Sequence, residues 1–373
     1  MPITASIRAG MDQREKTTHQ IERALAAKLG ALGPEEVRNE AEAGNELIAG
    51  RLVRMADAYC DAFGLEAKDP AGRVGHLIRA FGTGDLGGAF RNVANTLVSR
   101  AFVGTSEIWP MLVREGFTTD FRAFDRSGVG MAGALPAKPE HGEYKPGALR
   151  VETETMALGA YGALFPLTRE LFLNDAEGHL ADIFRDGGAA AALTIGERYS
   201  ADLTANPAFA PDGEDIFSAA HNNVGTSIDA GAPTVVTISH GRQLLRRQRY
   251  VGDLGLTGRA HYLNTPARYL VVPAALEAQA EQAIASEFRP STGEEQITVL
   301  VDSRLDDDSA TQWYLFADPE RLPVYEVAGL DGPARPRTEI EYDAERDVYQ
   351  IGVKLDFAGG FIDFRGAYRN DGA

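Results

Sequence analysis

The sequence of 373 residues predicts an α+β protein. Apolar residues recur at helical intervals through residues 1–103, whereas residues 128–162 are rich in glycine and proline and contain an alternating strand pattern. Beyond residue 239, short strand segments alternate with helix, and the chain ends on strands. With 44% hydrophobic residues, the chain can bury a sizeable core. We find no internal repeat and expect one intertwined unit with a helical segment in front.

Residues 1–103 are predicted to be helical. Ile21, Leu25 and Leu29 are spaced by four residues, as on one face of a helix. Pro34 suits the first turn of a further helix, and the acidic residues that follow it favour the positive end of the helix dipole. Strand signals are nearly absent from this range. We therefore expect an extended or loosely packed helical arm.

The stretch from residue 128 to residue 162 has no helical period. Val151, Thr153 and Thr155 alternate with Glu152 and Glu154, which is typical of an exposed β-ribbon. A two-stranded excursion has almost no core of its own, so it must rest on other structure. Such a ribbon would be a liability in a monomer and a contact arm in an assembly.

A long helix is predicted from about Asn174 to Asn206, because apolar residues again recur at helical intervals. Within it, Gly187–Gly188 indicates a kink or a point of close packing. After a loop, Ser239 is predicted to cap a helix that runs from Gly241 to Val251.

The second half of the chain predicts a compact α/β module followed by a strand-rich end. Strands are expected at Tyr269–Val272, Ile297–Val301, Trp313–Phe316 and Val324–Val327, with a helix at Ala274–Ser286. Three further strand candidates are EIEY, VYQIGVKLDF and GFIDFRGAY, the first two joined by a polar turn at Asp343–Asp347. We expect the chain to end in a hairpin or small sheet.

Metal and cofactor motifs have little support. The single cysteine, Cys60, excludes an internal disulfide framework and a multi-cysteine zinc site, and we expect it to be a buried thiol in a helix. The seven histidines are scattered, and none has the HExxH spacing. Gly82–Gly87 fits GxGxxG, but the preceding GHLIRAF is helix-like where a dinucleotide site requires a strand. We interpret it as a loop between helices.

Candidate catalytic groups are also weakly supported. Ser106, Ser218 and Ser227 lack the GxSxG elbow that exposes a nucleophile. His221-Asn222-Asn223 is interpreted as a set of polar loop residues that bond to their own backbone. Asp306-Asp307-Asp308 is interpreted as a solvated turn, since adjacent carboxylates point in different directions. We predict no catalytic, cofactor-binding or metal-binding residue and expect that the protein is not an enzyme.

Charge and hydropathy limit the partners. No run of about eighteen apolar residues occurs, and the first residues lack the apolar core of a signal peptide, so we expect cytoplasmic synthesis and no membrane partner. The formal net charge of −17 argues against broad nucleic-acid binding, which normally needs a positive surface to displace counterions from phosphates.

Three stretches occur in a specific order and spacing. They are PLTRELFLND (Pro166–Asp175), IFSAAHNNVGT (Ile216–Thr226) with the SHGRQLLRRQRYVGDLGLTGRAHYLNTPARYLVVP block behind it, and the ending WYLFADPERLPVYEVAGLDG through VKLDFAGGFIDFRGAYRN. On these residues the chain resembles the major capsid proteins of tailed bacteriophages with the HK97-type fold, especially the subgroup related to prohead protease and capsid fusions. The resemblance spans about Thr105 to Asn370, and residues 1–103 match no segment that we can name.

The resemblance implies an HK97-type architecture behind the helical arm that the periodicity predicts at residues 1–103. Residues 136–162 would form the extended E-loop. Residues 104–135 and 163–238 would form the P-domain, with its spine helix at about 174–206. Residues 239–332 would form the α/β A-domain, and residues 333–373 would supply the return strands of the P-domain.

The resemblance also implies that the protein acts by assembly. Subunits would form hexamers and pentamers of an icosahedral shell around the double-stranded DNA genome, with the E-loop lying over a neighbouring subunit. Leu149, Val151 and Tyr161 would anchor the loop. Lys138 and Lys145 lie in the region from which some members of the fold form a covalent crosslink to a neighbour's asparagine. Since no partner asparagine can be identified, we expect non-covalent contacts.

A capsid protein of this kind would need no cofactor. Its partners would be itself, the portal protein, scaffolding, protease and decoration proteins, and packaged DNA through non-specific contact. It would be located in the virion after assembly in the host bacterial cytoplasm. Because the sequence begins at Met1, we expect either that no front segment is removed or that the arm is retained.

Two alternatives remain open on the sequence alone. An encapsulin-like nanocompartment shell would have the same fold but would enclose an enzyme cargo. An α/β enzyme built on residues 239–332 would instead show a concave pocket with convergent titratable groups.

Overall fold

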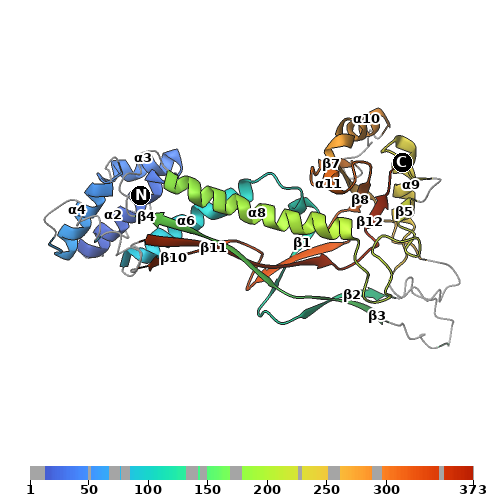
Figure 1. Cartoon of the computed structure of the whole chain (residues 1–373), viewed down its shortest axis with the longest axis horizontal. Coiled ribbons are helices and arrows are strands. Elements are labelled where there is room, and N and C mark those ends of the chain that lie inside the picture. The colour runs from blue at the N-terminus through green and yellow to red at the C-terminus, as the bar shows by residue number, and fades with distance from the viewer. Residues whose placement is uncertain are drawn as a thin grey trace. The chain divides into compact units, whose positions relative to one another are not determined.

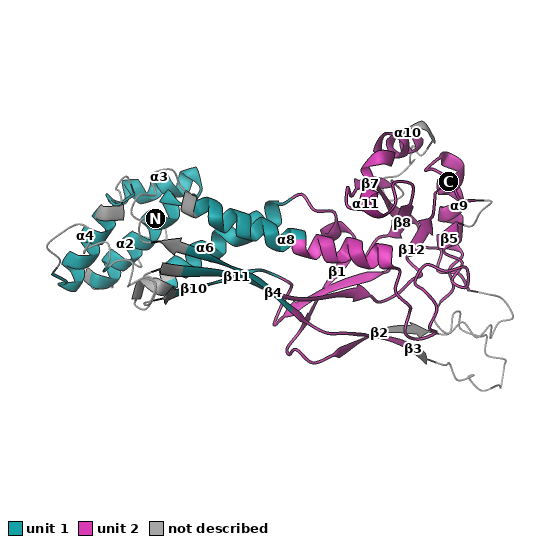
Figure 2. Ribbon diagram, viewed as in Figure 1, with its two compact units in different colours: residues 1–105, 160–193, 335–355 teal, residues 106–159, 194–334, 356–373 magenta. Residues whose placement is uncertain are grey.

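A computed structural model divides the chain into two compact units, each assembled from separated stretches of sequence (Figure 2). The first unit comprises Met1–Thr105, Ala160–Leu193 and Arg335–Leu355, and the second comprises Ser106–Gly159, Thr194–Ala334 and Asp356–Ala373. The structure describes residues 13–48, 52–66, 76, 85–131, 142, 149–168, 179–225, 229–250, 261–287, 296–343 and 348–372.

The described part of the first unit combines helices with strands. Its helices are α2 (Gln13–Lys28), α3 (Pro34–Glu42), α4 (Leu52–Phe63), α6 (Asp85–Gly104) and the first part of α8 (His179–Ala205). Its strands are β4 (Gly159–Thr168), β10 (Arg337–Asp343) and the first part of β11 (Val348–Phe361), which pairs with β4 and, antiparallel, with β10. α3 begins at Pro34 as predicted, and the Glu36 carboxylate accepts a hydrogen bond from the Gly33 amide at 2.8 Å.

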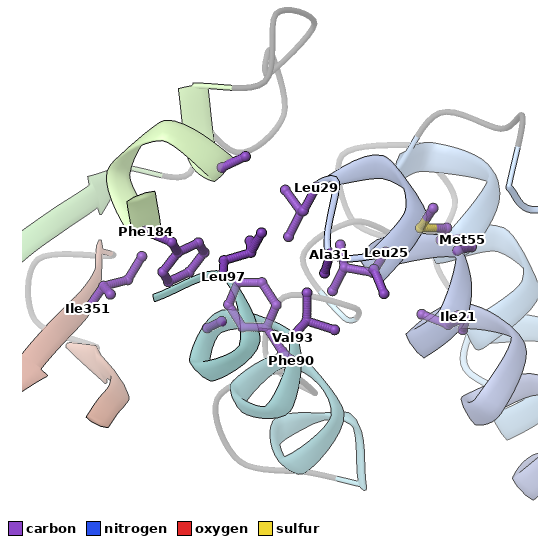
Figure 3. Close-up of a cluster of buried hydrophobic side chains, with 14 of the residues drawn as sticks. Ile21, Leu25, Leu29, Ala31, Met55, Phe90, Val93, Leu97, Phe184 and Ile351 are labelled. Atoms are coloured by element: carbon purple, nitrogen blue, oxygen red, sulfur yellow. The ribbon is translucent and has the colours of Figure 1, made fainter. Parts of the chain in front are cut away.

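One apolar core joins α2, α4, α6, α8 and β11 (Figure 3). Ile21 and Leu25 of α2 are 0% and 1% exposed and belong to the same buried cluster as Phe90 of α6 and Phe184 of α8. The rings of Phe90 and Phe184 meet edge to face, with their centroids 6.0 Å apart. The helical prediction is therefore confirmed for the described part of residues 1–103. The prediction of a loosely packed arm is wrong, because the apolar stripe of α2 is fully buried.

Helix α8 is the predicted long helix, and its first described residue is His179; residues 169–178 lie outside the described ranges. Gly187–Gly188 is a point of close packing and not a break, since α8 continues through it. A Cβ at Gly188 would overlap the Val98 carbonyl oxygen of α6, and a Cβ at Gly187 would lie 2.7 Å from a methyl of Val353. Larger residues would push α6 and β11 away from the helix.

The second unit contains a five-stranded sheet in the order β5-β12-β8-β6-β7. The strands are β5 (Val224–Gly225), β6 (Ala267–Val272), β7 (Thr298–Val301), β8 (Trp313–Ala317) and β12 (Ala367–Asn370). Helices α9 (Val235–Arg246) and α10 (Glu277–Glu287) pack on it through a core that includes Ile238, Leu270, Trp313, Leu315 and Tyr368. The strands predicted at 269–272, 297–301 and 313–316 are confirmed within two residues. The predicted helix begins as a 3-10 turn at Ala274–Leu276 and continues as α10.

The sheet assignments of two predicted strands are corrected by the structure. β9 (Tyr325–Leu330) does not join the module but pairs in parallel with β1 (Val113–Thr118) and antiparallel with Phe357–Phe361 of β11. GFIDFRGAY is not one strand, because residues 362–366 leave β11 and turn before β12 pairs with β8. Both errors concern long-range pairing, which local patterns do not specify.

The start of α9 also differs from the prediction. The helix begins at Val235, and Thr234 is its N-cap, with its hydroxyl accepting a hydrogen bond from the Thr237 amide at 3.3 Å. Ser239 therefore lies inside the helix. The β-branched run that follows Thr234 concealed the cap, since such residues have a strand preference when considered alone.

Candidate assembly interface

Strands β2 (Phe124–Met131) and β3 (Leu149–Met156) form a separate two-stranded antiparallel sheet in the second unit (Figure 1). Phe124 lies opposite Met156, and Met131 lies opposite Leu149. The prediction of a two-stranded ribbon is confirmed, and its pairing begins at Phe124, ahead of residue 136 where the loop was expected to start. We call residues 124–131 and 149–156 the ribbon.

Among the ribbon side chains that the structure describes, apolar packing occurs only at the base. Met156 and Leu158 form a small buried cluster with Ala358 and Ile362, and Phe124 packs against it. Farther along, the described side chains are polar or exposed: the Thr155 hydroxyl donates to Asp125 at 2.7 Å, and Val151 is 56% exposed. A strand pair with this little apolar burial needs other contacts to fix its direction.

The first such contact is a buried carboxylate, that of Glu326 on β9, whose residue is 1% exposed. Arg114 of β1 donates to it from Nε at 2.9 Å, and Arg126 of the ribbon donates to its other oxygen. Gly116 of β1 provides the space, because a Cβ there would lie 2.7 Å from the Glu326 carboxyl carbon. Burying a charge is costly unless it is paired, so this carboxylate requires its two guanidinium partners.

The second contact is made by Arg365, which lies in the turn between β11 and β12. Its Nη1 and Nη2 atoms donate to the two carboxylate oxygens of Glu152 in the ribbon, at 2.7 and 3.0 Å. This is the bidentate geometry that makes arginine and carboxylate pairs both strong and directional. Nη1 also donates to Asp363 at 3.0 Å. Burial raises the pKa of the Asp363 carboxyl, although the charge of Arg365 opposes that shift.

The third contact joins the ribbon to the loop that follows α8. The Ala210 amide donates to the Glu154 carboxylate at 2.6 Å. Burial raises the pKa of Glu154, the Ala210 hydrogen bond lowers it, and the nearby charge of Asp212 raises it further. Arg126, Glu152 and Glu154 therefore hold the base of the ribbon on three separate segments, through two ion pairs and one backbone amide.

The three residues predicted to anchor the loop lie on two different strands. Leu149 and Val151 both lie on β3, two residues apart, and the backbone alone is described for Leu149. Tyr161 lies on β4 and is 37% exposed. Lys138 and Lys145 lie outside the described residues. Sequence reasoning missed Arg126, Glu326 and Arg365, whose partners are about two hundred residues away in the chain.

The polar loop motif behaves as predicted. The His221 imidazole is hydrogen-bonded to the Ile216 carbonyl at 3.1 Å through Nδ1 and to Asp212 at 2.9 Å through Nε2. Asn223 accepts a hydrogen bond from the Ser218 amide and donates one to the Ile216 carbonyl. The His221 ring also stacks on Phe364, with centroids 3.7 Å apart. The hydrogen bonds organise the loop on itself, and the ring contact joins it to the turn between β11 and β12.

Three other sequence motifs have mixed outcomes. Cys60 is buried in α4, as predicted. The solvated-turn interpretation is wrong for Asp306, which accepts hydrogen bonds from the Ala274 and Ala275 amides at 2.7 and 3.1 Å. In the GxGxxG motif, residues 82–84 lie outside the described ranges, and α6 begins at Asp85.

Among the residues that the structure describes, no group of three His, Cys, Asp or Glu side chains is arranged to hold a metal ion. No helix in the same ranges combines the length and hydropathy needed to cross a bilayer.

The family comparison decides the identity. A family model described as "Phage capsid protein" matches residues 152–370, which is more than half of the chain. The chain belongs to the phage capsid protein family. The resemblance noted in the sequence is thereby confirmed at the level of a phage capsid protein, an α+β chain that is located in the virion. Its assignment to the subgroup of protease and capsid fusions remains a prediction.

Solved phage capsids are distant structural neighbours of this capsid protein. The capsid of Myoviridae phage XM1 is 14% identical, with 70% of this chain and 90% of that chain covered and a TM-score of 0.39. The procapsid of bacteriophage JBD30 is 14% identical, with 77% and 75% covered and a TM-score of 0.42. The capsid of Ralstonia phage GP4 is 14% identical, with 69% and 85% covered and a TM-score of 0.44. No curated protein matches the capsid protein.

Proposed function

We propose that this capsid protein assembles into hexamers and pentamers of an icosahedral shell that encloses the phage double-stranded DNA genome. The observation that carries the proposal is the ribbon. Its base is fixed by three sets of charged contacts, whereas its described outer part has polar and exposed side chains and no core. A strand pair whose base is fixed but whose outer side chains are exposed is expected to pack against another molecule.

The parts of the chain receive proposed roles on the same basis. The ribbon and residues 136–162 would form the E-loop that lies over a neighbouring subunit, with Leu149, Val151 and Tyr161 as contacts. Helix α8 would be the spine of the P-domain, residues 239–332 the A-domain and residues 333–373 the return strands. Residues 1–103 would remain attached as a structural element that packs on α8. Lys138 and Lys145 would make non-covalent contacts.

Further partners follow from the same proposal. A portal protein would occupy one vertex, and scaffolding, protease and decoration proteins would act during or after assembly. DNA would meet the inner wall through non-specific contact, which suits a chain with a formal net charge of −17 because close binding of phosphate is disfavoured.

The direct test is negative-stain electron microscopy of the concentrated full-length protein, with size-exclusion chromatography and light scattering on the same sample. Closed shells or hexamer-sized and pentamer-sized particles are expected. A uniform monomer or dimer, both alone and after co-expression with the neighbouring phage head genes, would contradict the proposal.

A pair of variants tests the role of the ribbon. Val151→Asp places a charge at an exposed ribbon position and is expected to abolish shells while leaving the melting temperature of the soluble subunit unchanged. Val151→Thr keeps a β-branched side chain of similar size and is expected to assemble normally. Equal shell yields from the two variants would argue against a contact at Val151.

A further inference from the structure

A polar pocket of about 460 Å³ lies within the second unit, at the end of α9. The loop that contains His221 forms one wall, the turn at Phe364 and Arg365 forms another, and the segment after α9 forms the third. The described lining residues are Ala220, His221, Asn222, Leu244, Arg247, Gln248, Arg249, Tyr250, Tyr262, Phe364 and Arg365. Three of these side chains are arginines, and none is an aspartate or a glutamate.

Some charged side chains of the lining have ion-pair partners, and others have none within the described ranges. Arg365 is paired with Glu152 and Asp363, and His221 is bonded to Asp212. Arg247 and Arg249 are exposed, and neither has an ion-pair partner within the described ranges. The pocket therefore presents two guanidinium groups that can donate hydrogen bonds to a carboxylate or another anion. Among the described lining residues there is no carboxylate that would compete for these two groups.

The wall that carries these arginines is held in place. The buried Gln248 amide donates to the His221 carbonyl at 2.9 Å, and the Gln248 carbonyl accepts from the Leu263 amide at 2.8 Å. Arg249 and Tyr262 form an isolated antiparallel bridge. A fixed backbone lowers the entropy cost of binding, so the arginine side chains project from a preorganised edge.

We infer that this pocket binds carboxylate side chains from an acidic surface segment of a second copy of this chain. The inference rests on the proposed assembly, which brings copies together, and it names a contact outside the ribbon. Arginine and tyrosine dominate the energetic centres of protein interfaces, and Tyr250 and Tyr262 are 42% and 44% exposed at the pocket. The guanidinium fork matches a carboxylate in two hydrogen bonds.

Charge and size favour a second copy over the packaged genome. With 54 acidic and 37 basic residues, any other copy offers many carboxylates to a pocket of opposite charge. A pocket of about 460 Å³ accommodates a few side chains. It is too small to admit a DNA duplex. Two unpaired arginines also provide little of the counterion release on which phosphate binding depends.

The first experiment measures the chemistry of the pocket on soluble subunits. Hexaglutamate is titrated into the full-length protein by isothermal calorimetry, beside a DNA duplex of equal charge. Binding of the peptide, weakened at least tenfold in the double variant Arg247→Glu/Arg249→Glu, is expected. The control Arg122→Glu/Arg321→Glu makes the same change in net charge at exposed arginines outside the pocket and is expected to bind as the unaltered chain does. Absence of peptide binding, or tighter binding of the duplex, would overturn the inference.

The second experiment identifies the occupant inside assembled shells. Tyr262 is replaced by the photo-crosslinking residue p-benzoylphenylalanine, and shells are grown from a mixture of isotope-labelled and unlabelled subunits. Mass spectrometry is expected to find Tyr262 peptides joined to an acidic peptide of the other isotope. Crosslinks to DNA, crosslinks within one copy, or none at all would reject a second copy as the occupant. If unaltered subunits form no shells, the proposed function fails, whereas the peptide titration still decides the chemistry of the pocket.

Discussion

The ribbon and the sheet that contains β8 are held together by different forces. All five residues of β8 are buried, and the sheet around it has an apolar core that includes Trp313, Leu315 and Leu270. In its described part the ribbon has apolar contacts only at the base, and it depends on Arg126, Glu152 and Glu154 for its direction. Apolar burial responds weakly to salt and pH, whereas ion pairs that reach the surface respond to both. The fold of the sheet should therefore depend little on salt and pH, whereas the direction in which the ribbon points should depend on both.

The largest effect is expected from the core of the sheet. Trp313 is 0% exposed and its indole nitrogen donates to the Gly231 carbonyl at 2.8 Å. Trp313→Ala should lower the free energy of unfolding by about 3–5 kcal/mol, because it leaves a large cavity. Urea denaturation followed by circular dichroism measures this change. Trp313→Phe, which fills more of the space, should cost less, and equal losses would show that the cavity is not the cause.

A smaller effect is expected from the ribbon's buried carboxylate. Glu326→Gln leaves Arg114 and Arg126 without their negative partner, and because both guanidinium groups are partly exposed we expect a loss of about 2 kcal/mol. Amide hydrogen exchange should speed up at residues 125–127 and 152–155 and should not change in β6 and β8. Glu341→Gln, at an exposed position, is the control. Faster exchange in β8 would show that the two regions are not independent.

The stability contributed by Asp363, which lies beside the ribbon's partner Arg365, should depend on pH. The pKa of Asp363 is raised above its ordinary value of 3.8, chiefly by burial, so the folded chain holds this proton after the unfolded chain has lost it. The stability from this group is therefore full below pH about 3.8 and is lost as the pH rises through the raised pKa. Asp363→Asn should become more stable relative to the unaltered chain across that window. Urea titrations at several pH values measure the difference, and a constant difference would contradict the assignment.

The smallest effect is expected at Tyr199 of α8, whose buried hydroxyl has no hydrogen-bond partner in the described structure. Tyr199→Phe should change the free energy of unfolding by less than about 0.5 kcal/mol, since only an unsatisfied group is removed. Tyr325 lies against it, with ring centroids 5.0 Å apart, and donates to Asp202 at 2.6 Å. Tyr325→Phe should cost about 1–2 kcal/mol by loss of that bond. Thermal melts of the two variants provide the comparison.

Local features of the fold were predictable from the sequence. The spacing of Ile21, Leu25 and Leu29 specified a helix, and the alternation around Val151 specified a strand of a ribbon. Each pattern repeats over a few residues and reflects burial of one face, so a single segment contains the necessary information. The packing of α2 against α6 and α8 was not predictable, because a helical stripe does not identify its partner.

Long-range pairing accounts for most of the remaining differences. β9 was recognised as a strand, but its neighbours β1 and β11 come from distant parts of the chain. The anchors of the ribbon have the same character, since Arg126 and Glu326 are 200 residues apart. One signal was present: Glu326 interrupts the apolar strand VYEVAGL, and a carboxylate at a buried strand position requires cations nearby. The sequence does not say which arginines supply them.

The burial of Cys60 has a practical consequence for following the ribbon. Cys60 is the single thiol of the chain, and it is 2% exposed in α4. A cysteine introduced at Val151 would therefore be the only thiol that a maleimide dye reaches readily, with no need to remove the native one. Fluorescence from such a label would report when the ribbon passes from water to a covered environment, and so would time the joining of subunits directly.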